Sequence, residues 1–150
     1  MKAIRSQTLF VRMLVASSIV LTLALSGAAL DSARSGKLHL IKNTSEYTGL
    51  PGAFATITES NLAEIPVGSK VFFDQAVDIP TGLLDSNIVL DAGNGNRAVG
   101  RCTLDLTTLI GLCTFSDGIG TLAGFHSRLV ESYVSGSDFD LSGTYHFASK

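Results

Sequence analysis

The sequence predicts an all-β fold, namely an eight-stranded antiparallel β-barrel preceded by an N-terminal signal helix. Past Leu30, no long segment places apolar residues at helical spacing, and short apolar runs are instead separated by clusters of Gly, Asn, Asp and Ser. Eight such runs follow one another, and eight strands suit a closed barrel, which leaves no sheet edge free to pair with another chain. An open two-sheet sandwich fits the same length and strand number and is the alternative.

The expected strands follow the order of the apolar runs. They cover residues 37–42, 53–59, 70–77, 87–90, 98–106, 109–116, 120–134 and 139–147. Several of the segments between them, residues 91–96, 116–118 and 135–138, are rich in residues that tolerate left-handed backbone angles, as turns require. In the last expected strand apolar and polar side chains alternate, so one face is buried and the other faces water or a cavity.

Residues 1–29 have the order of a secretory signal peptide. Basic residues precede an apolar stretch at residues 13–25, and small residues suited to cleavage after Ala28 or Ala29 follow. A membrane anchor is the alternative, but the strongly apolar run is about a dozen residues long, against the ~20 that a spanning helix needs. We therefore expect a secreted or periplasmic protein whose barrel domain comprises residues 30–150.

The charge of the exported part argues against two classes of partner. Three of the 11 basic residues but none of the 13 acidic residues lie in the predicted signal peptide, so the remaining chain carries a net charge of −5. An acidic protein has no electrostatic attraction for nucleic acid or for anionic lipid surfaces. We expect no nucleic-acid partner and, once the signal peptide is removed, no membrane contact.

The two cysteines, Cys102 and Cys113, both lie in the exported part. A hairpin centred between Thr107 and Thr108 places them directly opposite each other, and in an oxidising compartment they should form a disulfide. Closing so short a loop stabilises a protein by roughly 3 kcal/mol in the chain-entropy model. Two free thiols or half of a metal site are the alternatives, although three scattered histidines and no further cysteine disfavour zinc, and we assign no metal ligands.

Five of the charged residues within expected strands are candidates for a place inside the barrel. A charge in a strand must face water, a partner or a cavity, because burial without compensation is costly. One or two charged side chains inside the barrel would be the strongest indication of a functional site. The order of residues in the sequence does not show which of the charged residues these are. The five are Asp74, Arg101, Asp105, Arg128 and Glu131.

Four ordered segments resemble the allene oxide cyclase barrel family, including its signal-bearing bacterial members, and more distantly the plant dirigent proteins. They are residues 67–73, 100–106, 111–125 and 138–147. The resemblance implies an eight-stranded barrel with a central cavity, often assembled as a homotrimer, that works without a cofactor. It favours the barrel over the sandwich.

The resemblance also implies ligand-binding positions. Plant cyclases hold their substrate with a glutamate, an asparagine and a Ser-Pro pair near the first strand, and with an asparagine after the Val-Gly strand. Asn43 and Pro51 match two of these positions, Gln75 takes that of the second asparagine, and Phe73 ends the Val-Gly strand. The glutamate falls on Ile41 or Lys42, so the family's carboxylate has no counterpart there, and no catalytic residue is assigned.

Two functions therefore compete. The first is a barrel that binds a hydrophobic small molecule in a cavity lined by Phe and Tyr, guiding its cyclisation or coupling without a cofactor. The second is a non-catalytic structural or interaction module whose barrel is filled by its own side chains. The volume of the interior cavity distinguishes the two, since a cavity too small for a drug-sized ligand would exclude the first. A lipocalin-type carrier is disfavoured, since that family usually begins its first strand with Gly-x-Trp and this chain has no tryptophan.

Overall fold

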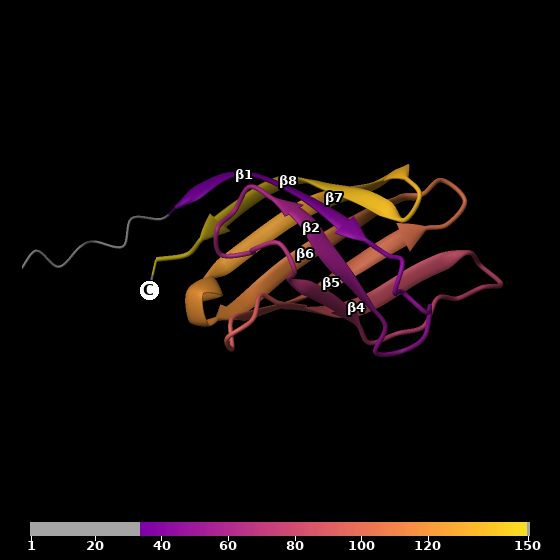
Figure 1. Cartoon of the computed structure of the whole chain (residues 1–150), viewed down its shortest axis with the longest axis horizontal. Coiled ribbons are helices and arrows are strands. Elements are labelled where there is room, and N and C mark those ends of the chain that lie inside the picture. The colour runs from indigo at the N-terminus through magenta and orange to yellow at the C-terminus, as the bar shows by residue number, and fades with distance from the viewer. Residues whose placement is uncertain (1–33, 150) are drawn as a thin grey trace, which may run out of the picture.

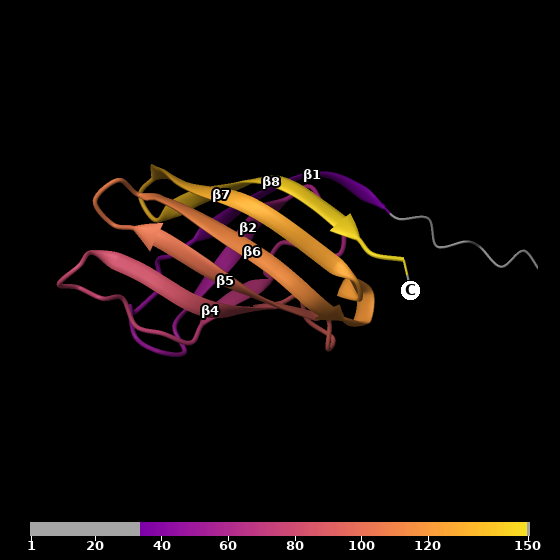
Figure 2. The ribbon, with the colours of Figure 1, turned by 180° about the vertical axis from the view of Figure 1, so that it is seen from behind.

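Antiparallel pairing of the first strand with the last closes the chain into a barrel. The computed structural model describes residues 34–149, and the predicted signal peptide with its helix lies outside them. Within the described residues the order of hydrogen-bonded strands is β1 to β8, each beside its neighbour in the chain, with β8 paired to β1. This closure, visible from both sides in Figures 1 and 2, confirms the eight-stranded antiparallel barrel and excludes the open sandwich.

The strands lie close to the segments that the apolar runs predict. They are β1 (Ser35–Asn43), β2 (Phe54–Ser60), β3 (Lys70–Phe73), β4 (Leu83–Asp91), β5 (Arg97–Asp105), β6 (Ile110–Ile119), β7 (Phe125–Ser135) and β8 (Asp138–Phe147). The only helical element within residues 34–149 is the 3₁₀ turn η1 (Gly120–Leu122). No helix in that range has the length and apolar character needed to cross a membrane.

Three expected strand boundaries are wrong. β4 begins at Leu83 rather than at residue 87, because residues 83–86 pair with residues 102–105 of β5. β3 ends at Phe73 rather than at residue 77, because side chains replace the backbone pairing beyond it: the Gln75 amide donates to Ser86 Oγ at 3.1 Å and the Asn87 amide donates to Gln75 Oε1. β7 begins at Phe125 rather than at residue 120. Gly120 and Gly124 have φ of 66° and 75°, and these left-handed angles interrupt the extended chain.

The expected turn at residues 116–118 is instead a β-bulge inside β6. Asp117 has a φ of 51°, which agrees with a residue type that tolerates left-handed angles. The pairing of β5 with β6 shifts register here, from Val99 opposite Ser116 to Arg97 opposite Ile119. The bulge accommodates the extra residues of β6 without ending the strand.

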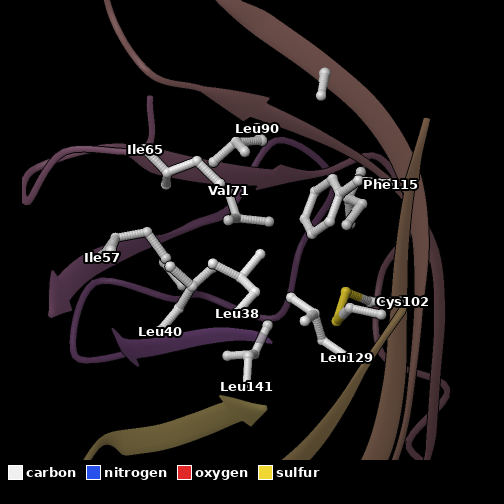
Figure 3. Close-up of a cluster of buried hydrophobic side chains, with 14 of the residues drawn as sticks. Leu38, Leu40, Ile57, Ile65, Val71, Leu90, Cys102, Phe115, Leu129 and Leu141 are labelled. Atoms are coloured by element: carbon white, nitrogen blue, oxygen red, sulfur yellow. A yellow bond between two sulfur atoms is a disulfide. The ribbon is translucent and has the colours of Figure 1, made fainter. Parts of the chain in front are cut away.

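The apolar core runs along the inside of the barrel from one end towards the other. Figure 3 shows its side chains converging from several strands, among them Leu38, Leu40, Ile57, Val71, Leu90, Phe115, Leu129 and Leu141. The loop at residues 61–69 and the turn η1 cover the first of these ends with Leu62, Ile65 and Leu122, all of which are buried. We call it the closed end of the barrel.

The opposite end carries the loops at residues 44–53, 74–82, 106–109 and 136–137, and we call it the mouth. β1 ends at the mouth and β8 begins there, since Asn43 pairs with Asp138. Inward-facing residues near the ends of these strands are therefore the ones that a molecule entering the barrel from the mouth would meet.

Candidate ligand-binding cavity

A cavity of about 150 Å³ opens inside the mouth of the barrel. Its walls are mainly apolar and are formed by Phe73, Val77, Leu84, Leu104, Leu106 and Phe139. Four polar residues complete the lining, namely Lys42, Thr44, Tyr47 and Glu131. The cavity is smaller than the roughly 300–1,000 Å³ of sites that enclose drug-sized ligands. A drug-sized molecule, which the first predicted function requires, does not fit inside it.

Lys42 and Glu131 form a buried ion pair beside this cavity. Lys42 Nζ lies 2.7 Å from Glu131 Oε1, and the two side chains are 2% and 0% exposed. Strand alternation puts both inside the barrel, because Lys42 shares the inward face of β1 with Leu40 and Glu131 shares that of β7 with Leu129. Burying two charges is unfavourable unless their hydrogen-bonding capacity is well satisfied.

The hydrogen-bonding capacity of this pair is not fully used. An ammonium has three donors, and within the described part of the chain Glu131 is the only acceptor found for Lys42. Glu131 Oε1 has the ion-pair contact but no aligned hydrogen bond. Glu131 Oε2 lies 3.3 Å from the sulfur of Cys113, which carries no hydrogen in a disulfide and so cannot donate. Both carboxylate oxygens can therefore still accept a hydrogen bond.

Tyr47 adds a third polar group from the loop at residues 44–53. Its hydroxyl is buried with no hydrogen-bond partner among the described residues, and its ring packs edge-on to Phe73 at 5.1 Å between centroids. Burial raises the pKa of Tyr47, and the negative charge of Glu131 raises it further. The phenol is thus held in its neutral form, in which the O–H can donate a hydrogen bond into the cavity.

The disulfide lies next to the carboxylate. Cys102 and Cys113 pair across β5 and β6 in the predicted register and are bonded to each other, which confirms the expected disulfide. Their sulfur atoms and a carboxylate oxygen of Glu131 lie within 4.8 Å of one another. Because the two sulfurs are bonded together and neither is a thiolate, this group does not provide a metal site.

Of the four predicted ligand-binding residues, the structure brings only Phe73 to the cavity. Asn43 is used at the barrel rim, where its Nδ2 donates to Asp138 Oδ1 at 2.7 Å. Pro51 is exposed in the loop at residues 44–53. Gln75 accepts a hydrogen bond from the Asn87 amide through Oε1 and is exposed.

Among the five charged strand residues, Glu131 is the one that the structure places inside the barrel. Asp74, Arg101 and Arg128 are exposed. Lys42 is missing from the predicted candidates, although it is one of the two positions on which the glutamate of the resembled family falls. The alternation of Leu38, Leu40 and Lys42 is the pattern that could have identified it.

Two of the scattered histidines meet on the outer surface. His126 of β7 pairs with His146 of β8, and their rings stack with centroids 4.8 Å apart. They alternate with the inward-facing Phe125 and Ser127, so they lie outside the barrel and take no part in the cavity.

Comparison of this chain with protein-family models, with curated proteins and with solved structures gives no match. The barrel is therefore established by its own strand pairing, and a function has to be argued from the cavity.

Proposed function

We propose that this protein binds a small, mainly apolar molecule in the mouth-end cavity and holds an oxygen atom of that molecule against Lys42 and Tyr47. The observation that carries the proposal is the convergence of a buried ammonium, a buried carboxylate and a buried phenol, each with unused hydrogen-bonding capacity, on one apolar cavity. Unsatisfied buried polar groups are rare and require an explanation. A bound polar group supplies one.

The cavity limits the size and chemistry of this ligand. A void of about 150 Å³ lined by apolar side chains accommodates a molecule of benzene size. A carbonyl or hydroxyl oxygen on that molecule can accept from Lys42 and Tyr47, while a ligand hydroxyl can donate to Glu131 Oε2. A longer ligand would extend out of the mouth between the loops.

Two further observations support an exported binding barrel. The disulfide is consistent with an oxidising compartment such as the periplasm or the extracellular space. The segments that resemble allene oxide cyclase and dirigent barrels imply a ligand in the barrel, and guidance of its cyclisation is the activity that such a site would serve. Glu131 of β7 contributes a carboxylate to the lining of the cavity.

A filled, non-catalytic barrel is the competing function, and one observation favours it. The core side chains fill the barrel from the closed end up to the walls of the small mouth-end cavity. In that case the polar groups would be satisfied by water, which needs two to four polar partners.

A titration with benzyl alcohol, followed by amide NMR shifts, distinguishes the two. We expect saturable shifts confined to residues around the mouth, and their loss in Val77→Phe, which fills the cavity. Val130→Phe makes the same change on the exposed outer face of β7 and should retain binding. Weak, non-saturating shifts spread over the surface of the wild-type protein would show that the barrel is filled.

A further inference from the structure

We propose that Lys42 captures small aldehydes or ketones covalently, as an imine, inside the mouth-end cavity. This inference rests on the proposed binding function, because it assigns the ligand class and the reacting atom of the same site. Its basis is the placement of a primary amine, 2% exposed, against an apolar cavity, with one carboxylate 2.7 Å away and no second acceptor within the described residues.

The pairing with Glu131 supplies the reactive form of the amine. Two buried charges lose the hydration that they have in water. When they make few hydrogen bonds in the protein, that loss is only partly offset. Attack on a carbonyl group requires an unprotonated amine, and Glu131, 2.7 Å from Lys42 Nζ, is placed to accept the lysine proton when a carbonyl compound enters the cavity. Desolvated lysines next to a base are the ones that proteins use as nucleophiles towards carbonyl groups.

The same carboxylate completes the reaction without any other reagent. The neutral amine attacks the carbonyl carbon, a C–N bond forms, and a proton moves from nitrogen to oxygen to give a carbinolamine. Glu131 then returns its proton to the carbinolamine hydroxyl, the C–O bond breaks, and one water molecule leaves. The products are a protonated imine on Lys42 and the Glu131 carboxylate, so the charge of the pair is unchanged.

Neighbouring side chains can assist both the attack on the carbonyl group and the formation of the protonated imine. The neutral Tyr47 hydroxyl can donate to the carbonyl oxygen and polarise it before attack. Lys42 Nζ lies 5.0 Å and 5.7 Å from the ring centroids of Phe73 and Phe139, distances at which aromatic faces stabilise a cation. The protonated imine nitrogen would occupy nearly the same place.

The wild-type protein provides the test, with its other lysines as internal references. The protein is incubated with benzaldehyde and sodium cyanoborohydride, which reduces an imine to a stable benzyl amine but leaves the aldehyde largely intact, and the modified peptides are mapped by mass spectrometry. Lys37 is exposed on the outside of β1, and Lys70 lies over the ring of Phe54 with Nζ 3.9 Å from its centroid. We expect one benzyl group per chain, on Lys42, introduced on the order of tenfold faster than on Lys37 or Lys70.

The variants and the probe separate this inference from the binding function. Glu131→Gln should slow the labelling of Lys42 about tenfold or more, whereas Tyr47→Phe should slow it by less. Labelling of Lys37 and Lys70 alone, in protein whose mouth residues still respond to benzyl alcohol, would overturn imine formation and leave the binding function standing. Labelling of Lys42 without a benzyl alcohol response would support imine formation and contradict reversible binding of a small apolar molecule.

Discussion

Lys42 on β1 reaches Glu131 on β7 across the intervening strand β8. Lys42 pairs with Phe139 of β8, and Glu131 pairs with Leu141 two residues further along that strand. The ion pair therefore passes over the inner face of β8 and links three adjacent strands near the mouth. No hydrogen-bond ladder connects β1 directly with β7, so this contact can be removed without breaking strand pairing.

Removing one member of the pair should destabilise the protein far more than removing both. Lys42→Met or Glu131→Leu leaves an uncompensated buried charge, and each should lower the free energy of unfolding by about 3–5 kcal/mol. The double variant replaces the pair by apolar side chains and should recover most of that loss. Urea denaturation of the four proteins measures the coupling.

The exposed pair on the outside of the barrel provides the control. Arg101 Nε lies 2.6 Å from Asp85 Oδ1, with both side chains largely in water. Exposed ion pairs contribute little to the free energy of unfolding, so Asp85→Ala and Arg101→Ala should change it only slightly. If the double variant of Lys42 and Glu131 loses as much unfolding free energy as the two single variants together, the two buried charges do not stabilise each other.

Opening the disulfide should weaken the β5–β6 hairpin. Cys102 and Cys113 are fully buried and 11 residues apart, and a cross-link over so short a loop contributes about 3 kcal/mol in the chain-entropy model. The variant Cys102→Ala/Cys113→Ala should lose that amount in urea denaturation. Adding reductant should destabilise the wild-type protein and leave the variant unaffected, and equal responses of the two would argue against a stabilising cross-link.

The sequence predicted the barrel well because strand alternation and turn chemistry are local. The hairpin register around Cys102 and Cys113 depends only on the position of its turn, and it is correct. The end of β3 could not be predicted, since Ala76 and Val77 continue the apolar pattern, and the hydrogen bonds that hold this segment in a loop come from Ser86, Asn87 and Gly49 in other parts of the chain.

The candidate site was harder to predict for a similar reason. Glu131 could be recognised as a charge within a strand, but its partner Lys42 lies 89 positions earlier, and only barrel closure brings them together. Asn43 and Gln75 were assigned from the resemblance. Both are engaged in hydrogen bonds around the mouth, outside the cavity lining, and sequence pattern does not distinguish an amide at the rim from one inside.

Three inward-facing strand glycines should not tolerate even one added methyl group. At Gly143, a Cβ would lie 2.0 Å from the carbonyl oxygen of Arg128, a backbone atom that cannot move without displacing β7. Gly100 and Gly111 meet backbone oxygens at 1.9 Å and 2.1 Å. Gly143→Ala should therefore lower stability by at least about 1–3 kcal/mol, as overpacking does, or prevent folding.

Gly36→Ala is the matched control for this prediction. A Cβ at Gly36 would meet the ring edge of Tyr145 at 3.0 Å, and that side chain can rotate away. We expect the melting temperature of Gly36→Ala to be close to that of the wild type and well above that of Gly143→Ala. Equal melting temperatures for the two variants would show that close backbone approach does not explain the glycine at position 143.

Asp105 should make stability depend on pH in the acid range. Its Oδ1 accepts hydrogen bonds from the amides of Thr107 and Thr108 at 2.7 Å and 3.2 Å, and these bonds hold the pKa of Asp105 below its ordinary value of 3.8. A carboxyl whose pKa is lower in the folded state stabilises fully above its unfolded pKa and loses this contribution as the pH falls through the folded value.

The stability advantage of the wild type over Asp105→Asn should therefore be constant near neutral pH and shrink below about pH 4. Asparagine retains an oxygen that can accept from the same amides, so the comparison isolates the charge rather than the turn. Urea midpoints measured between pH 7 and pH 3 provide the test. An advantage that stays constant down to pH 3 would mean that the Asp105 charge does not stabilise the turn between β5 and β6, which forms part of the mouth.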